Sequence, residues 1–237
     1  GPLWHAGKPR AIEKIEIDPV TLEPKYSTIN GVKPRGITGS GLIDILAELL
    51  SAGVIDRTGR INTEIKNPRI RTGTHFPEFV VAWATETDIG KDIVITENDI
   101  KNLIMSKASI HAACVTLMNE AGVTRHDIGT IYFAGAFGNY INKKNATIAG
   151  LIPEIDLERI KNIGNGAVAG ANLALVNRRK RKMLDGIAGR IAYIELNAEP
   201  SFMDEYTSSA FLPHTDLSLF PRVQALLESI RERKEAH

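Results

Sequence analysis

The stretch that decides the fold is Ile131-Tyr132-Phe133-Ala134-Gly135-Ala136-Phe137-Gly138-Asn139-Tyr140. Its first half is an apolar run with β-branched and aromatic residues, which is typical of a buried strand. Its second half is a turn in which only small residues flank the phenylalanine, so a ligand can approach the backbone closely. Ligands of open α/β sheets bind beyond the carboxyl ends of strands. The alternative is a tight strand-to-helix connection. The turn supplies the first candidate binding residues, which are Gly135, Ala136, Phe137, Gly138 and Asn139.

Two further glycine-rich segments open predicted helices, and both could hold oxygen atoms of a nucleotide. They are Gly36-Ile37-Thr38-Gly39-Ser40-Gly41 and Gly164-Asn165-Gly166-Ala167-Val168-Ala169-Gly170. The N-terminus of a helix presents unpaired N–H groups and a partial positive charge, which suits phosphate or ribose oxygens. The second segment is not a Walker sequence, and Ala169 occupies the last glycine position of a dinucleotide-binding fingerprint. For the first segment the alternative is a flexible helix start with Ser40 as N-cap. The candidates are Gly39, Ser40, Gly41, Gly164 and Asn165.

The longest predicted helix carries a lysine on its apolar stripe. Thr96 and Asp99 form an acidic variant of the capping box, and the stripe then runs to Gly122. Lys107 lies on this stripe, four residues before His111. Its ammonium group either reaches solvent along an apolar stem or points into a ligand cleft. His111 is interpreted as a hydrogen-bonded core histidine.

Hydrophobic periodicity and turn signals predict a chain that mixes strands and helices. Residues 62–74 are expected to form a polar loop without regular structure. Because strands and helices alternate after residue 90, the pattern favours an α/β fold. The predicted strands cover 11–18, 24–29, 79–84, 92–95, 131–134, 160–163 and 191–196, and the predicted helices cover 41–53, 96–122, 144–150, 164–181, 202–210 and 222–235.

Composition excludes several classes of protein. The 237 residues are 43% apolar and 24% charged, and the net charge of +1 gives no reason to expect nucleic acid or an anionic membrane as partner. The basic run Arg178-Arg179-Lys180-Arg181-Lys182 is expected in the last turn of a helix, as a solvated face. No apolar run reaches 18 residues and no signal peptide is visible, so a cytoplasmic protein is expected.

The single cysteine and the missing catalytic motifs limit the chemistry further. Cys114 is expected in the core, and one cysteine excludes both an intrachain disulfide and an iron–sulfur cluster held by this chain alone. The sequence contains no His-Glu-x-x-His and no Gly-x-Ser-x-Gly, and its carboxylates are scattered. The residues by themselves therefore predict a nucleotide- or phosphate-binding α/β domain and no reaction. No metal-binding residues are predicted.

From about residue 11 to residue 221 the chain resembles the C-terminal part of the ATP-dependent reductive activators of corrinoid proteins. These activators belong to the superfamily of acetate and sugar kinases, heat-shock chaperones and actin. The segments that carry the resemblance are Gly36-Ile37-Thr38-Gly39-Ser40-Gly41-Leu42-Ile43-Asp44, Ser106-Lys107-Ala108, Phe133-Ala134-Gly135-Ala136-Phe137-Gly138-Asn139-Tyr140-Ile141, Gly150-Leu151-Ile152-Pro153, Gly164-Asn165-Gly166-Ala167 and Tyr193-Ile194-Glu195-Leu196.

The resemblance implies an actin-like (ribonuclease H-like) mixed-sheet lobe with flanking helices, incomplete at its N-terminal side. It assigns residues 135–138 to the adenosine motif, places Lys107 beside the nucleotide, and puts the segment from Gly164 near the hinge of the cleft. ATP with Mg²⁺ is the implied cofactor. The partner is a corrinoid protein of a methyltransferase system, whose Co(II) is restored to Co(I), and a homodimer is left open. Residues 11–237 form the domain, and residues 1–10 are a protease-cleavage remnant or a disordered start.

This chain departs from the family in what it lacks. The family's iron–sulfur domain and its two acidic glycine loops for phosphates and Mg²⁺ are absent from the sequence. Hydrolysis by this chain alone is therefore not expected, and whether it is itself an enzyme stays open. Two alternatives remain: a docking or dimerisation module that does not bind ATP, and an ATP-gated activator of another redox enzyme such as a 2-hydroxyacyl-CoA dehydratase.

Overall fold

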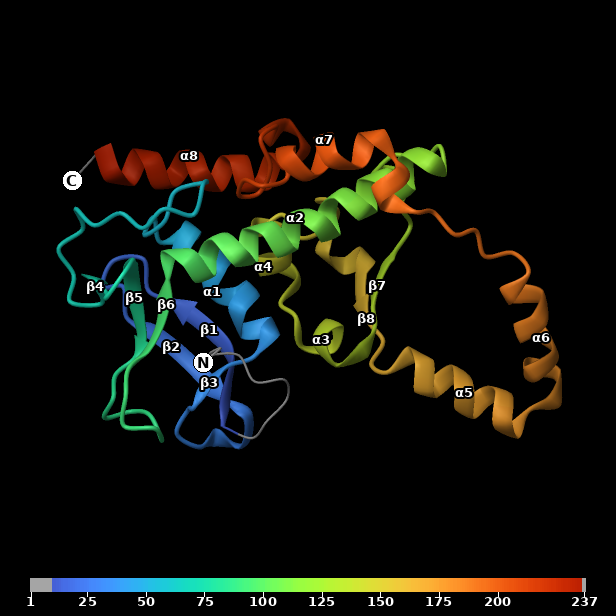
Figure 1. The fold of residues 1–237 in the computed structure, drawn as a ribbon, viewed down its shortest axis with the longest axis horizontal. Helices are drawn as coiled ribbons and strands as arrows, with labels where there is room; N and C mark the ends of the chain where they lie inside the picture. The colour runs from blue at the N-terminus through green and yellow to red at the C-terminus, as the bar shows by residue number, and fades with distance from the viewer. Residues whose placement is uncertain (1–9, 236–237) are drawn as a thin grey trace.

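A computed structural model describes residues 10–235, so nearly all of the segment 1–10 lies outside the described residues. The first sheet has the order β2-β1-β3 (Figure 1). Strand β1 (Ala11–Ile17) pairs antiparallel with β2 (Pro24–Thr28) and parallel with β3 (Gly36–Ile37). Apolar side chains of β1, Ile12, Ile15 and Ile17, are buried. They face α1 (Gly39–Ser51), whose Ile45, Leu46 and Leu49 are fully buried, so this helix packs on the sheet as its apolar stripe predicts.

The second sheet is antiparallel, with the order β4-β5-β6. The predicted pairing of the strands around residues 79–84 and 92–95 is confirmed by β5 (Pro77–Ala82) and β6 (Ile93–Thr96). Strand β4 (Ile70–Thr72) lies in the segment predicted to be an irregular loop. The strand reads Ile70-Arg71-Thr72, and only Ile70 is buried. One apolar residue gives no alternation of apolar and polar residues, so the sequence did not predict a strand here.

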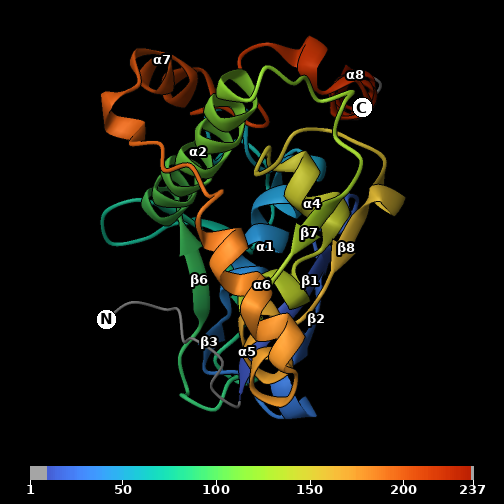
Figure 2. The same cartoon turned by 90° about the vertical axis from the view of Figure 1, so that its right-hand side faces the viewer.

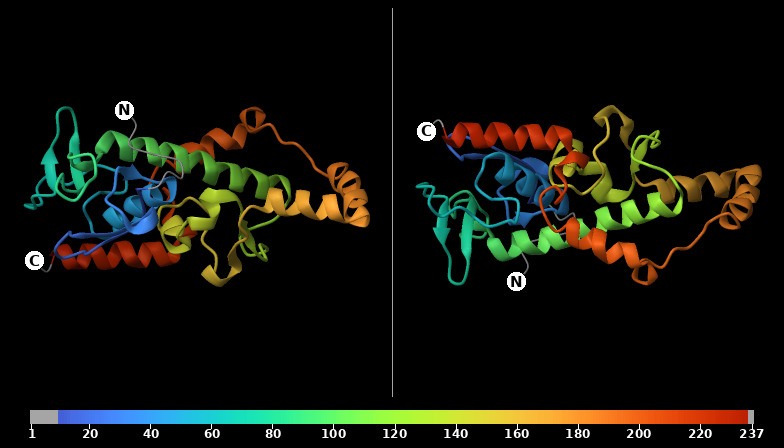
Figure 3. Two further views of the ribbon diagram at one scale, coloured as in Figure 1. Left: turned by 90° about the horizontal axis from the view of Figure 1, so that it is seen from below. Right: turned by 90° about the horizontal axis from the view of Figure 1, so that it is seen from above.

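Helix α2 (Glu97–Glu120) follows β6 directly, and its predicted start is confirmed in detail. The Thr96 side chain accepts a hydrogen bond from the Asp99 backbone N–H, and the Asp99 carboxylate accepts one from the Thr96 backbone N–H. Each group satisfies a donor that the first helical turn leaves unpaired. Seen from below and above, α2 and α8 (Pro221–Glu235) flank the first sheet and α1 on opposite sides (Figure 3).

Strands β7 (Ile131–Phe133) and β8 (Ile160–Asn162) form a two-stranded parallel sheet, which confirms both predictions. The residues predicted to form an open turn after β7 are instead a short helix, α3 (Gly135–Tyr140). This is the tight strand-to-helix connection given as the alternative, with Ala134 alone between β7 and α3. Helix α4 (Lys143–Ile148) follows, capped by the Asn142 side chain.

After β8 the chain leaves the body in two helices, α5 (Gly166–Val176) and α6 (Arg178–Ala188), which pack on each other (Figures 1 and 2). The prediction of one helix through residue 181 is wrong. Asn177 interrupts the helix with extended backbone, and its side chain caps α6 by accepting from the Lys180 N–H. The basic run therefore begins α6 instead of ending α5. Its side chains are exposed, as a solvated face requires.

The predicted strand over residues 191–196 is also wrong. Ile191 and Tyr193 are exposed, and no strand of the described chain pairs with this segment. β-Branched and aromatic residues favour strands only where a neighbouring strand and a buried face exist. The chain continues into α7 (Pro200–Ser208), which packs along α2. The 3₁₀ turns are Ile29–Gly31, Leu157–Arg159, Leu196–Ala198 and Leu217–Leu219.

No helix within residues 10–235 combines the length and the apolar character needed to cross a bilayer.

Candidate nucleotide site

The three glycine-rich segments come together at the end of β7. The Phe137 ring lies against Gly39, where an added Cβ would stand 3.2 Å from the ring atom Cδ2. On the other side, the Gly135 N–H donates to the Gly164 carbonyl at 2.7 Å. Segments that are distant in the sequence are thus in contact.

Gly135 and Gly164 are glycines because of their backbone conformation. Their φ angles are +82° and +65°, a region that L-residues with a Cβ rarely adopt. No heavy atom lies within 4 Å of the Cβ position at either residue. Both therefore leave open space above the backbone, as close approach of a ligand requires.

Gly41 and Gly138 have a different explanation. A Cβ on Gly41 would stand 2.8 Å from the Ile12 carbonyl oxygen, and one on Gly138 would stand 3.2 Å from the Phe133 backbone. These glycines let helices pack closely against strands. Packing accounts for them without any ligand.

Two polar candidates cap helices or adjoin a cap. The interpretation of Ser40 as N-cap is wrong, because the cap of α1 is Thr38, whose Oγ1 accepts from the Gly41 N–H at 3.1 Å. Ser40 is buried, and its hydroxyl shares a 2.9 Å hydrogen bond with that of Thr38. Asn165 is the N-cap of α5 and accepts from the Val168 N–H at 3.1 Å. Both side chains are thus engaged within the fold.

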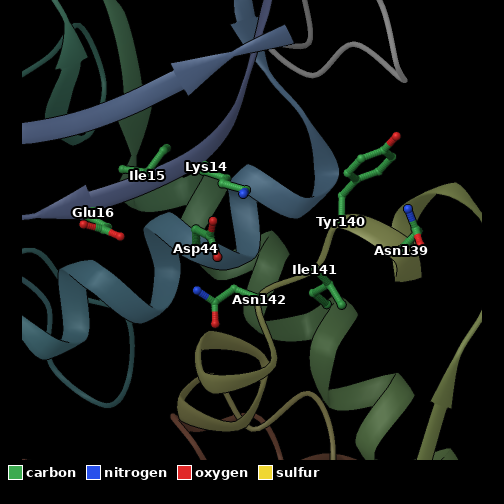
Figure 4. Close-up of a pocket in the computed structure, with 8 residues that line it drawn as sticks. All are labelled: Lys14, Ile15, Glu16, Asp44, Asn139, Tyr140, Ile141 and Asn142. Carbon is green, nitrogen blue, oxygen red and sulfur yellow. The ribbon is translucent and has the colours of Figure 1, made fainter. Parts of the chain in front are cut away.

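A cavity of about 370 Å³ adjoins the far end of α3 (Figure 4). This volume lies within the range of small-molecule sites. Its lining comes from β1, α1, the end of α3 and the connection from α3 to α4, and consists of Lys14, Ile15, Glu16, Asp44, Asn139, Tyr140, Ile141 and Asn142. Asn139 is the one predicted site residue in this lining. The side chain of Ala136 lies outside what the structure describes.

Asp44 is the buried charged group of this cavity, and the prediction missed it together with the exposed Lys14 and Glu16. It is only 2% exposed, and the Asn145 side-chain amide donates to its carboxylate at 2.9 Å. Burial raises the pKa of Asp44 to about 6, against the hydrogen bonds from Asn145 and from the Ile15 backbone, which favour the ionised form. The signal was visible in the sequence, since Asp44 interrupts an apolar stripe between Ile43 and Ile45.

The Asp44 pKa predicts how stability changes with pH. The folded protein holds this proton more tightly than the unfolded chain, so the contribution of Asp44 to stability falls as pH rises from about 4 to 6 and is constant above. The Asp44→Asn variant carries an amide at this position, which cannot ionise. The urea midpoint of wild type is therefore expected to fall, relative to that of the variant, across this window.

Asp56→Asn is the matched control for this titration. The pKa of Asp56 lies below its ordinary value because hydrogen bonds from Thr58 and Arg60 outweigh its burial. The midpoint of wild type relative to this variant should therefore fall as pH decreases through 4, the opposite sign. Parallel curves for wild type and Asp44→Asn would contradict the Asp44 assignment.

The hydrogen bonds of Lys107 go to residues outside the glycine segments. Lys107 is fully buried, and its ammonium Nζ donates to the carbonyl oxygens of Phe211 and Pro213, both at 2.5 Å. It neither reaches solvent nor lines the cavity of Figure 4. Burial lowers the pKa of Lys107 to about 7, with the Glu205 carboxylate acting in the opposite direction.

His111 is buried as expected, whereas Cys114, expected in the core, is only partly buried. His111 is buried, but its Nε2 lies 3.7 Å from Glu205 Oε1, and its buried Nδ1 has no hydrogen-bond partner within the described residues. Burial lowers the pKa of His111 to about 4, so the ring is neutral near pH 7. Burial also raises the pKa of the Cys114 thiol.

The glycine segments offer no carboxylate to a magnesium ion. Within residues 10–235 no group of three or more His, Cys, Asp or Glu is arranged to hold a metal ion. Where the glycine segments meet, the chain offers backbone groups and the Phe137 ring, while Mg²⁺ prefers carboxylate oxygens and water. We therefore assign no metal ligands to these segments.

The mixed α/β fold is that of an ASKHA domain, the actin-like class. The family model described as the C-terminal domain of RACo, the ASKHA domain, matches residues 5–224. The chain belongs to this family.

Its relatives include activators of corrinoid proteins. The corrinoid activation enzyme RamQ of Eubacterium limosum is 33% identical, with 84% of this chain and 35% of that protein covered. A reductase named for a Co(II) methylated amine-specific corrinoid protein, from Methanosarcina barkeri, is 29% identical over 74% of this chain and 28% of its own length. A solved reductive activator for a corrinoid, iron–sulfur protein is 44% identical, with a TM-score of 0.86, over 92% of this chain and 35% of that one. The chain thus spans about a third of the length of these relatives.

Proposed function

We propose that this chain is the nucleotide-binding C-terminal part of an ATP-dependent reductive activator, which restores Co(I) in the corrinoid protein of a methyltransferase system. The observation that carries the proposal is the meeting of the three glycine segments, through the contact of Gly39 with Phe137 and the hydrogen bond from Gly135 to Gly164. The membership of the ASKHA family and the names of the relatives support it.

Each residue of the proposed site has a role that follows from its geometry. Gly135 and Gly164 expose backbone that the nucleoside can approach, and the half-exposed Phe137 ring offers an apolar wall. Asn139 and Asp44 supply polar groups in the adjoining cavity. Gly41, Gly138 and Ser40 hold the packing around these segments, and Asn165 caps α5. Lys107 is left out, because its ammonium group is already engaged with two backbone carbonyls.

ATP would act here as a conformational ligand. A nucleotide shifts an equilibrium between two states only by the difference between its affinities for them. The glycine segments join α1, α3 and the start of α5, so a nucleoside bound among them contacts several elements at once. Electron transfer to cobalt requires a redox group, and none is assigned to this chain.

The test is reduction of a Co(II) corrinoid protein, followed by absorption, by the longest natural polypeptide that contains this chain. We expect the Co(I) band to appear with an electron donor and ATP, and not without ATP. ATP binding without Co(I) would move the function to another ATP-gated partner, such as a 2-hydroxyacyl-CoA dehydratase. Absence of ATP binding would favour a docking or dimerisation module.

A further inference from the structure

Residues 211–215, between α7 and α8, are held by an unusual set of hydrogen bonds. All five successive backbone carbonyls of this segment accept from a cationic side chain. Lys107 of α2 donates to the carbonyls of Phe211 and Pro213. Charge-assisted hydrogen bonds of this kind are stronger than neutral ones.

Arg57 holds the remaining three carbonyls. Its Nε donates to Leu212 at 3.1 Å, and its Nη2 donates to His214 at 2.5 Å and to Thr215 at 3.2 Å. The backbone carbonyl of Arg57 in turn accepts from the Leu212 N–H at 2.9 Å. The turn that follows α1 is therefore attached to the same segment as α2.

The end of α4 also contacts residues 211–215, through the backbone of Gly150. Gly150 lies two residues after the end of α4, and a Cβ added there would stand 2.2 Å from the Pro213 carbonyl oxygen. The Pro213 carbonyl therefore lies between Lys107 on one side and the Gly150 backbone on the other. The side chain of His214 is also fixed, since its Nε2 lies 3.1 Å from Glu205 Oε1 and its Nδ1 accepts from the Asp216 N–H.

We propose that residues 211–215 are a conformational brace that locks α2 to the end of α4 and to the turn after α1, so that these elements move as one body. The brace goes beyond the proposed function and does not depend on ATP binding. Outside the segment, α2 packs on α7 and α1, and its Ile100 and Ile104 contact the turn at Gly59. Figures 1 and 2 show α2 running along the outside of the first sheet, with α7 on its outer side.

The test measures the distance between α2 and α4 with spin labels on Asn102→Cys and Lys144→Cys, in a Cys114→Ser background. Both labelled positions are exposed. With the brace intact we expect one narrow distance distribution. Lys107→Met keeps the length of the apolar stem but removes both donors, so the distribution should broaden clearly. Lys101→Met is the control, because Lys101 is exposed on the same helix and pairs with Glu97 of that helix.

Arg57→Gln gives an independent reading, because Arg57 is half-buried and its loss leaves the Lys107 bonds in place. We expect a broader distribution for this variant too, smaller in extent than for Lys107→Met. If Lys107→Met fails to fold, the distance distribution of Arg57→Gln tests the proposal alone. A folded variant of either kind that keeps the narrow wild-type distribution, with or without a loss of thermal stability, would overturn the brace and leave these cations a purely local role.

Discussion

Replacing Gly135 with aspartate is expected to lower ATP affinity at least about tenfold, the equivalent of roughly 1.4 kcal/mol, while the protein stays folded. The new side chain would project into the open space above the backbone, where we place the nucleoside. Its carboxylate would repel phosphate. Aspartate tolerates a φ of +82° better than most residues, so the strain on the fold is modest. Calorimetric titration with ATP, on the longest natural polypeptide that contains the chain, measures the effect.

Gly122→Asp is the matched control for this prediction. Gly122 follows the end of α2 with a φ of +64°, and no heavy atom lies within 4 Å of its Cβ position. The substitution therefore introduces the same charge with similar backbone strain, away from the glycine segments. ATP affinity should be unchanged in this variant. Equal affinities for wild type, Gly122→Asp and a folded Gly135→Asp would remove the glycine segments from the nucleotide site.

The largest loss of stability is expected for Gly150→Ala. Its φ of +69° is a left-handed conformation that costs an L-residue about 1–2 kcal/mol. The added methyl group would stand 2.2 Å from the Pro213 carbonyl oxygen, a backbone atom that Lys107 also holds, and overpacking of this kind costs about 1–3 kcal/mol. The free energy of unfolding, from urea titration, should fall by about 3 kcal/mol in total.

Gly122→Ala separates the two contributions. It carries the left-handed strain without any neighbouring atom, so a loss of about 1 kcal/mol is expected. The difference between the two variants then measures the contact with Pro213. A Gly150→Ala protein as stable as Gly122→Ala would show that the segment 211–215 moves aside without cost, and the close approach would have no energetic importance.

Sequence patterns predicted correctly those helices and strands in which capping residues and hydrophobic periodicity indicate the same element. The capping box at Thr96, the apolar stripe of α1 and the strands on either side of α3 were all predicted correctly. The three glycine segments were each identified as candidates. That they meet could not be predicted from spacing, because the contact between Gly39 and Phe137 depends on how β1, α1 and β7 pack.

The predictions failed where contacts between residues distant in the sequence determine the local structure. Residues 191–196 have strand composition but no partner strand among the described residues, and β4 has a partner but no strand composition. Lys107 was recognised as unusual on an apolar stripe, but its acceptors lie about a hundred residues later in a segment without periodicity. Asp44 could have been found, since a carboxylate inside an apolar helical stripe needs a buried partner.

The attachment of residues 211–215 also sets an order of events during synthesis. Lys107 finds its acceptors 104 and 106 residues further along the chain, and Arg57 finds its own 155 or more residues later. At a translation rate of about 5–20 residues per second, roughly 5–20 s pass between the synthesis of Lys107 and the synthesis of its acceptors. Closing such long loops is also slow in refolding from denaturant. Helix α2 therefore reaches its final environment only when the C-terminal part of the chain has been synthesised, and a nascent chain cut short before residue 211 would leave this lysine without the carbonyls that it needs inside the fold.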